Sequence, residues 1–323
     1  MSTLEFFEAE VHRITHESDG VLSMELRHPL GHQLPEWDAG SHLDVLLPNG
    51  LIRQYSLCSD PGQRDSWRLA VLREAAGRGG SAYVHDELRP GTKIQVRGPK
   101  NNFALAPAPE YVFLAGGIGI TPIMPMVRAA AAGDKPWRLI YMGRSRKNMA
   151  FLDELAVHGD KLHIHADDES GFYPLAELLA DRSADFHLYT CGPGPLLKVI
   201  ESLAEAWEDP SRLHFERFAA DPEAAGAAVA PHEGDHEFTV QGTDGTEINV
   251  PVGVSILQAL EDAGRNPLNS CREGICGTCE TPVVSGEIDH RDSLLSEDER
   301  EAGDTMMICV SRCKGKRMVL DLG

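Results

Sequence analysis

Five of the seven cysteines in this 323-residue chain lie in its last quarter, and their spacing constrains the fold more than any other feature. Cys271, Cys276 and Cys279 form a C-x4-C-x2-C run, and Cys309 follows 30 residues after Cys279. The two glycines inside the run allow the backbone to approach the sulfurs and to adopt angles that a Cβ forbids. The run therefore predicts a loop that wraps closely around a thiolate-bound metal centre.

The same spacing discriminates between two kinds of thiolate centre. It is the pattern of plant-type [2Fe–2S] clusters, in which four thiolates bind two irons. A structural zinc site also takes four thiolates, but a zinc ribbon usually shows two C-x2-C pairs and this chain has one. We expect the iron–sulfur cluster, with zinc as the alternative. Cys313 fits the spacing less well than Cys309 and is expected to be a spectator.

The chain is long enough for two or three domains. Over residues 1–107, short alternating apolar runs separated by Gly, Pro and Asn turns predict an antiparallel β-barrel. Over residues 108–222, apolar strand-like runs alternate with helical stretches, which predicts an α/β doubly wound domain. Small residues and prolines at 223–235 indicate a linker. Residues 236–323 start with a hairpin pattern and hold the cysteine run.

A glycine-rich turn follows the first apolar strand of the α/β region. The sequence Gly116-Gly117-Ile-Gly119-Ile-Thr121-Pro122 precedes a helical run. Its glycines allow a pyrophosphate to approach the backbone at a helix N-terminus, and proline suits the first helical turn. The turn departs from G-x-G-x-x-G, because proline takes the last position. By itself it is as compatible with an ordinary strand-to-helix turn as with nucleotide binding.

Three further segments suit a cofactor, although each has an ordinary structural explanation. Arg53-Gln-Tyr-Ser-Leu57 offers an arginine for phosphate, a tyrosine for stacking and a serine for a ring edge, or is a plain strand. Gly77-Arg-Gly-Gly-Ser81 opens a helical stretch at residues 82–88 and suits a phosphate, or Ser81 is simply the N-cap. Cys191-Gly-Pro193 ends the last strand of the sheet, where ligands bind, or Cys191 is a buried core thiol.

In this combination and order, the motifs resemble the phthalate dioxygenase reductase family over nearly the whole chain. The resemblance implies a multidomain fold: an FMN-binding antiparallel β-barrel at 1–107, an NAD(P)H-binding α/β doubly wound domain at 108–222 and an α+β (β-grasp) ferredoxin domain at 236–323. It also implies that electrons pass from NADH through FMN to a [2Fe–2S] cluster. NADPH is the open alternative to NADH.

The resemblance further implies roles for individual residues. Ser56, Thr121 and Cys191 are expected at the hydride-transfer site, with Ser56 near flavin N5. Phe218 is expected to cover the flavin with its ring, or to be a core residue before the linker. The other cofactor-binding candidates are Arg53, Gln54, Tyr55, Val71, Leu72, Arg73, Arg78, Gly79, Gly80, Ser81, Gly116, Gly117, Gly119, Pro122, Arg144, Ser145, Gly192 and Pro193. The expected cluster ligands are Cys271, Cys276, Cys279 and Cys309.

The implied activity is that of an oxygenase reductase, with a Rieske-type oxygenase or a cytochrome P450 as the electron acceptor. Residues 231–323 carry more than twice as many acidic as basic side chains, which suits a basic face on such a partner. The formal charge of −20 argues against nucleic acid and anionic membranes. Two alternatives are a stand-alone NADH:flavin reductase and a non-catalytic redox sensor. With no signal-peptide pattern and no long apolar run, the expected compartment is the cytoplasm.

Overall fold

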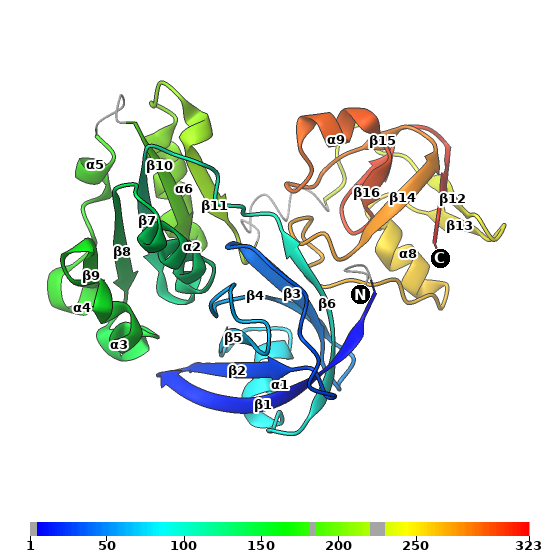
Figure 1. The fold of residues 1–323 in the computed structure, drawn as a ribbon. Coiled ribbons are helices and arrows are strands. Elements are labelled where there is room, and N and C mark those ends of the chain that lie inside the picture. The colour runs from blue at the N-terminus through cyan, green and yellow to red at the C-terminus, as the bar shows by residue number, and fades with distance from the viewer. Residues whose placement is uncertain (1–4, 181–184, 220–229, 323) are drawn as a thin grey trace. The chain divides into compact units, whose positions relative to one another are not determined.

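The computed structural model describes residues 5–180, 185–219 and 230–322 of the chain, which divides into two compact units. One unit comprises residues 1–218 and the other residues 219–323. The first contains an antiparallel sheet and a parallel sheet, and the second contains a mixed sheet with the cysteine-rich loop (Figure 1). This is the multidomain fold expected from the sequence.

The antiparallel sheet of the first unit closes on itself. Its strand order is β4-β3-β6-β1-β2-β5, so β4 and β5 are the two edges. Leu57, just after β4, pairs with Leu69 in β5 and joins these edges into the predicted barrel. The elements are β1 (Phe7–Ser18), β2 (Val21–Arg27), β3 (Ser41–Leu46), β4 (Ile52–Ser56), β5 (Trp67–Leu72), α1 (Gly80–Asp86) and β6 (Lys93–Asn101).

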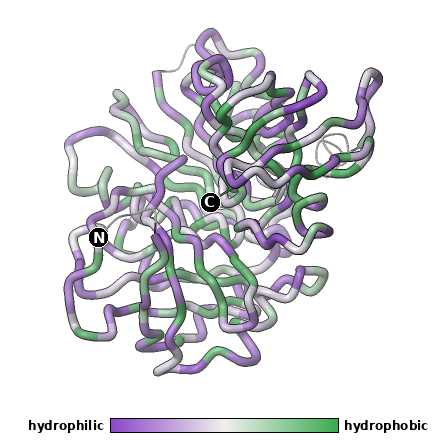
Figure 2. The backbone as a smooth tube through the Cα atoms, turned by 90° about the vertical axis from the view of Figure 1, so that its right-hand side faces the viewer, coloured by the Kyte–Doolittle hydropathy of each residue, from purple (hydrophilic) through white to green (hydrophobic). Residues whose placement is uncertain are grey.

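Alternation along these strands fills the barrel with apolar side chains. In β5, Trp67, Leu69 and Val71 point into the barrel core, whereas Ala70 points to a second core outside it. Figure 2 shows the resulting change between hydrophobic and hydrophilic residues along the strands. Strand period and burial thus agree, as expected for a half-buried antiparallel sheet.

The parallel sheet has the order β11-β10-β7-β8-β9, and every neighbouring pair is parallel. Separate apolar clusters cover its two faces, one including α2 and the other α6, which is the doubly wound arrangement. The strands are β7 (Glu110–Gly116), β8 (Trp137–Gly143), β9 (Leu162–Ala166), β10 (Phe186–Cys191) and β11 (Leu213–Glu216). The helices are α2 (Ile120–Ala132), α3 (Leu152–Leu155), α4 (Asp167–Ser170), α5 (Leu175–Leu178) and α6 (Gly194–Ala204).

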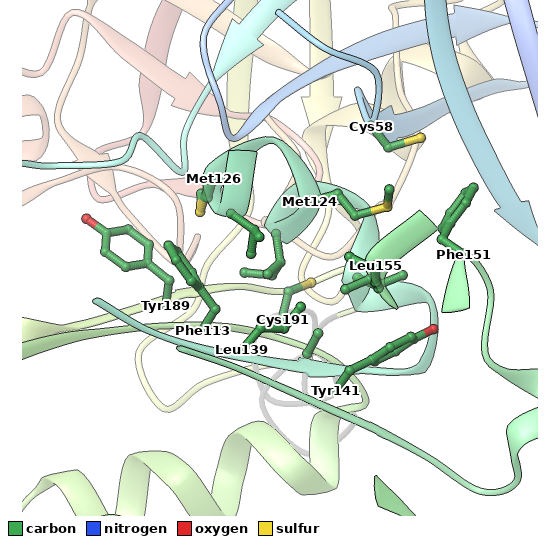
Figure 3. Packing of buried hydrophobic residues seen from close by; sticks show 14 of the residues in the cluster. Cys58, Phe113, Met124, Met126, Leu139, Tyr141, Phe151, Leu155, Tyr189 and Cys191 are labelled. Atoms are coloured by element: carbon green, nitrogen blue, oxygen red, sulfur yellow. The ribbon is translucent and has the colours of Figure 1, made fainter. Parts of the chain in front are cut away.

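One continuous apolar core joins the barrel to the parallel sheet. Cys58, Ala70 and Phe103 from the barrel side belong to the same cluster as Phe113 and Met124 of the nucleotide domain (Figure 3). The Phe103 ring also lies 5.8 Å from that of Tyr189 in β10. Because interiors pack to crystal-like density, this shared core explains why residues 1–218 form a single unit.

The second unit has a core of its own. Helix α8 packs on a sheet of order β13-β12-β18-β14-β16, in which β12 and β18 are parallel and the other pairs are antiparallel. This is the expected α+β arrangement. Its elements are β12 (Phe238–Gly242), β13 (Glu247–Val250), α8 (Ile256–Asp262), β14 (Glu280–Ser285), β15 (Ile288–Asp289), α9 (Glu297–Ala302), β16 (Thr305–Met307), β17 (Arg312–Cys313) and β18 (Arg317–Leu320).

The predicted linker at 223–235 falls mostly outside the described residues. Its last residue, Asp235, is held to the second unit by Arg291, whose Nη2 lies 2.5 Å from the Asp235 Oδ1. No helix within the described ranges is long and apolar enough to cross a bilayer.

A buried ion pair supports the barrel and gives a stability prediction. Asp44 is fully buried, and its Oδ2 lies 2.6 Å from Arg97 Nη2. The substitution D44N leaves Arg97 largely buried without its counter-charge, which costs about 3–5 kcal/mol for such pairs. All four tryptophans lie in the first unit, so tryptophan fluorescence during urea unfolding measures this loss. The control E36Q, at an exposed ion pair with Arg64, should leave the midpoint unchanged, and equal midpoints for both variants would contradict the prediction.

Candidate functional site

The first part of the site lies at the carboxyl edge of the parallel sheet. Strands β7 and β10 are neighbours, and Cys191 at the end of β10 pairs with Ala115. A Cβ on Gly119 would lie 2.2 Å from the Cys191 carbonyl oxygen, so the turn after β7 packs directly on the turn after β10. This contact brings the start of α2, with buried Thr121, next to the predicted Cys191-Gly192-Pro193 turn. The structure thus gathers the predicted nucleotide-binding turns at one place.

A carboxyl that the sequence analysis did not single out completes this edge. Glu216, at the end of β11, pairs with Cys191 and lies beside the Ser56 hydroxyl of barrel strand β4. Burial raises the pKa of Glu216 to about 8, and the nearby Ser56 hydroxyl offsets this only partly. Burial, with the charge of Glu216, also raises the pKa of the Cys191 thiol. Both groups therefore hold their protons at neutral pH.

Several buried polar atoms around Ser56 have unused hydrogen-bonding capacity. Within the described ranges, Ser56 Oγ, Glu216 Oε2 and both ring nitrogens of His42, the cross-strand partner of Ser56, make no hydrogen bond of good geometry. Ser56 and Glu216 are close enough for the hydroxyl to affect the carboxyl, but their atoms are not aligned as donor and acceptor. Buried polar atoms rarely stay unpaired, so this group marks a place where a ligand supplies partners. A flavin ring edge, with its carbonyls and ring nitrogens, fits this need.

The second part of the site is a basic cradle on the barrel. Arg53 crosses the start of α1, where a Cβ on Gly80 would lie 2.5 Å from the Arg53 Nε. The Arg53 Nη2 donates to the Arg78 carbonyl at 2.6 Å, and the Ser81 Oγ accepts from Glu74 N–H at 3.0 Å. Helix α1 begins at Gly80, two residues earlier than expected, after Gly79 in a left-handed conformation. The predicted residues therefore do converge, and two guanidinium groups with a helix start suit a phosphate.

The remaining barrel candidates lie in different environments. Tyr55 is partly buried, and burial raises its pKa to about 12, so its ring is neutral. Gln54 donates to Asp44 Oδ1 at 2.8 Å, and Arg73 is paired with Asp86 at 2.8 Å. The side chain of Val71 belongs to the barrel core, and Leu72 packs against the shared core. The side chains of Gln54, Val71 and Arg73 therefore make contacts within the protein.

On the nucleotide domain, the adenosine candidates follow β8. Arg144 is exposed, whereas Ser145 is buried and donates from its Oγ to Asn148 Oδ1 at 2.7 Å. Arg146 pairs with Glu169 of α4, with 3.0 Å between Nε and Oε1. At the end of the first unit, the Phe218 side chain is 46% exposed, which excludes the core-residue alternative for it.

The metal-binding candidate is the cysteine loop of the second unit. The sulfur of Cys271 lies within hydrogen-bonding reach of those of Cys276 and Cys309, and Cys309 is equally close to Cys279. All four are buried, and a backbone N–H, that of Glu273, points to Cys271 Sγ at 3.3 Å. Gly274 allows the loop to lie close to its support, because a Cβ there would lie 2.7 Å from Val310 Cγ2.

The four thiols form one connected group. Their contacts run from Cys276 through Cys271 and Cys309 to Cys279, and a plant-type cluster takes four thiolates. Cys313 lies apart in β17, with its Sγ 3.5 Å from the Arg317 carbonyl. The four thiols therefore fit a [2Fe–2S] cluster.

Two cysteine variants test this assignment. We expect C309S to lose the visible iron–sulfur absorption and the stoichiometric iron, because a two-iron cluster needs four thiolates. The matched variant C313S changes a buried cysteine whose Sγ contacts the Arg317 carbonyl and not the other four sulfurs. It should keep about two irons per chain. Iron analysis of both purified proteins checks this, and loss of iron in C313S with retention in C309S would reverse the assignment.

The raised pKa of Glu216 gives a pH prediction. Because the folded protein binds this proton with a pKa of about 8, and an unfolded chain with the ordinary 4.5, the folded state loses stability as pH rises through this window. The variant E216Q removes that dependence. The difference in melting temperature between E216Q and the parent protein should therefore shift in favour of E216Q between pH 5 and pH 8.5. Tryptophan fluorescence measures both melting temperatures. An equal difference at both pH values would show that Glu216 is ionised normally.

Comparisons with known proteins show the family of this chain. Residues 8–105 match the family model described as oxidoreductase FAD-binding domain, and residues 238–314 match the 2Fe-2S iron-sulfur cluster binding domain. The chain is 44% identical to phenoxybenzoate dioxygenase subunit beta of Ectopseudomonas oleovorans, over 97% of this chain and 96% of that protein. It is 40% identical to the phthalate 4,5-dioxygenase oxygenase reductase subunit of Pseudomonas putida, over 95% and 94%.

Solved structures give the same result. Phthalate dioxygenase reductase, described as a modular structure for electron transfer from pyridine nucleotides to [2Fe-2S], matches with a TM-score of 0.70 and 36% identity over 98% of both chains. An intact type IV self-sufficient cytochrome P450 monooxygenase matches with a TM-score of 0.84 and 41% identity, and this chain covers 41% of that longer one. The chain belongs to the phthalate dioxygenase reductase family of flavin- and [2Fe–2S]-dependent oxidoreductases.

Proposed function

We propose that this chain is the reductase component of an oxygenase system, passing electrons from NADH through FMN and a [2Fe–2S] cluster to an oxygenase component. One observation carries the proposal: a single chain holds both a site suited to hydride transfer and a four-cysteine cluster loop. A bound flavin would accept a hydride and release electrons singly, which links a two-electron donor to a one-electron centre.

The residues of the first unit would prepare the site rather than act as acid or base on a substrate. Ser56 would hold the flavin ring edge, and protonated Glu216 would supply a proton or hydrogen bond beside it. The buried, neutral Cys191 thiol would face the nicotinamide without adding charge. The glycine contact of Gly119 with the Cys191 carbonyl would fix the two nucleotide turns, so that substrate and ring meet within reaction distance.

We also propose the identity of the cofactors and the domain limits. FMN follows from the family resemblance and from the cradle of Arg53 with residues 78–81. NADH is favoured because Glu169, paired with Arg146, would repel a 2′-phosphate at the adenosine end. The domains would be 1–107, 108–222 and 236–323, joined by a linker at 223–235, with the cofactor-binding residues named from the sequence.

The partner proposal rests on the named relatives and on charge. Relatives include a vanillate O-demethylase oxidoreductase of a Pseudomonas species, at 41% identity, and a self-sufficient P450 monooxygenase. A Rieske-type oxygenase and a cytochrome P450 are therefore both candidates for the electron acceptor. The acidic second unit suits a basic docking face on either. None of the seven cysteines forms a disulfide, which fits the reducing conditions of the cytoplasm.

An anaerobic absorption titration tests the proposal. Stoichiometric NADH should bleach both the flavin and the iron–sulfur bands, because the electrons reach both centres, and NADPH should do so more slowly. Chromatography of the extracted flavin should give FMN. If NADH bleaches the flavin but never the cluster, the chain is a stand-alone NADH:flavin reductase, and if the protein turns over no electrons to ferricyanide, the sensor alternative gains support.

A further inference from the structure

A carboxylate of the nucleotide domain binds two arginines at the interface with the barrel. Glu154, in α3, accepts from Arg68 of barrel strand β5 at 2.9 Å through its Oε1. Arg128 of α2 donates to the same oxygen. Arg68, Glu154 and Arg128 are hereafter the Glu154 clamp. It is partly buried, with side chains 25%, 36% and 28% exposed, so water screens it only in part.

The two arginines also meet on one backbone carbonyl. The Cys58 oxygen accepts from Arg128 Nη1 at 3.1 Å and from Arg68 Nη2 at 3.2 Å. Cys58 lies two residues after Ser56, and Arg128 lies two helical turns after Thr121 in the same helix. The Glu154 clamp therefore connects the strand that carries Ser56 to the helix that begins at the nicotinamide side of the site.

The packing under the clamp holds Glu154 in place. Phe151, just before α3, is buried and has a φ of 63°, a conformation that is uncommon for residues other than glycine. The Arg68 guanidinium lies 4.9 Å from the centre of the Phe151 ring. Figure 3 shows Cys58, Met124, Phe151 and Leu155 on the same side of the shared core. Packing at the interface thus stabilises the unfavourable backbone conformation of Phe151, from which α3 begins.

Electrostatics explains why a carboxylate is needed at this point. Two guanidinium groups converge on one carbonyl oxygen, and without Glu154 their like charges would repel each other across the interface. An open hollow of about 300 Å³, lined in part by Arg128, Glu154 and Val157, gives Arg128 space to move away. Ion pairs that remain partly exposed add little to the free energy of unfolding. The main effect of losing Glu154 is therefore on the position of the parallel-sheet layer relative to the barrel.

We propose that Glu154 is a positioning residue for hydride transfer, because it clamps the nucleotide domain to the flavin-binding barrel. The inference rests on the proposed function, since it concerns the alignment of the flavin-binding barrel with the nucleotide-binding layer. A displacement of about 1 Å is enough to slow a reaction about 100-fold, because the reacting atoms must approach within about 3–3.5 Å. The clamp would thus affect the reaction while touching neither reactant.

The test uses the holoenzyme with E154Q, which keeps the shape of Glu154 and removes its charge. The control is E36Q, because Glu36 also pairs with an arginine, Arg64 at 2.7 Å, but entirely within the barrel. In stopped-flow experiments at saturating NADH, E154Q should slow flavin reduction about tenfold or more, with electron transfer from photoreduced flavin to the cluster unchanged. E36Q should match the parent protein in both.

A second measurement does not depend on activity. The fully buried Cys58 thiol lies at the interface, so its alkylation by iodoacetamide reports opening of the clamp. Peptide mass spectrometry should show alkylation about fivefold faster in E154Q than in the parent protein and E36Q. Unchanged alkylation together with unchanged flavin reduction overturns the proposal. Parent protein that NADH does not reduce would instead refute the proposed function, and the alkylation rates alone would then decide on the clamp.

If E154Q does not fold, R68Q replaces it. This variant keeps the Glu154–Arg128 pair and removes only the barrel side of the clamp. It should also speed alkylation of Cys58 and slow flavin reduction, and E154D, which keeps the charge, should recover part of the lost rate. Parent-like values for R68Q in both measurements contradict the proposal.

Discussion

Hydride transfer requires atomic contact between two reactants, and the two halves of the proposed site belong to different layers of the fold. Ser56 comes from the barrel, whereas Cys191 and Glu216 come from the parallel sheet. The apolar core shared by both layers holds them at a fixed separation, because a close-packed interior resists deformation. The glycine turns, the phosphate cradle and the buried carboxyl are useful only if this packing is maintained.

The second unit is built on a different plan. Its core is self-contained, and its cluster loop is supported by the segment that follows β15. Asp292 in that segment is buried, accepts from the backbone N–H groups of Leu294 and Leu295, and lies against Gly274 of the loop. The contacts that position the four thiols thus lie inside one unit.

The sequence predicted the features that depend on local chemistry. Cysteine spacing and the alternation of strands and helices identified the cluster loop and the three-part architecture, because each follows from neighbouring residues. Features that depend on distant partners were missed. Nothing near Gln54 or Arg73 in the chain indicates that Asp44 and Asp86 occupy these side chains. Glu216 was not singled out, since its burial arises only when β11 pairs with β10.

A contact with the barrel also explains why the start of α1 was misplaced. The sequence offered Ser81 as an N-cap as the alternative to a phosphate site, but Arg53 lies across Gly80, and Ser81 Oγ accepts a hydrogen bond from Glu74 N–H. A tertiary contact with the barrel strand therefore moved the helix start to Gly80.

The buried Glu216 carboxyl makes this edge of the parallel sheet sensitive to charge. Any negative charge that arrives near it makes ionisation of this carboxyl still less favourable. A nearby positive charge has the opposite effect and eases release of the proton. The protonation of one carboxyl thus registers the sign of whatever charge comes next to it, in a chain that is otherwise strongly acidic.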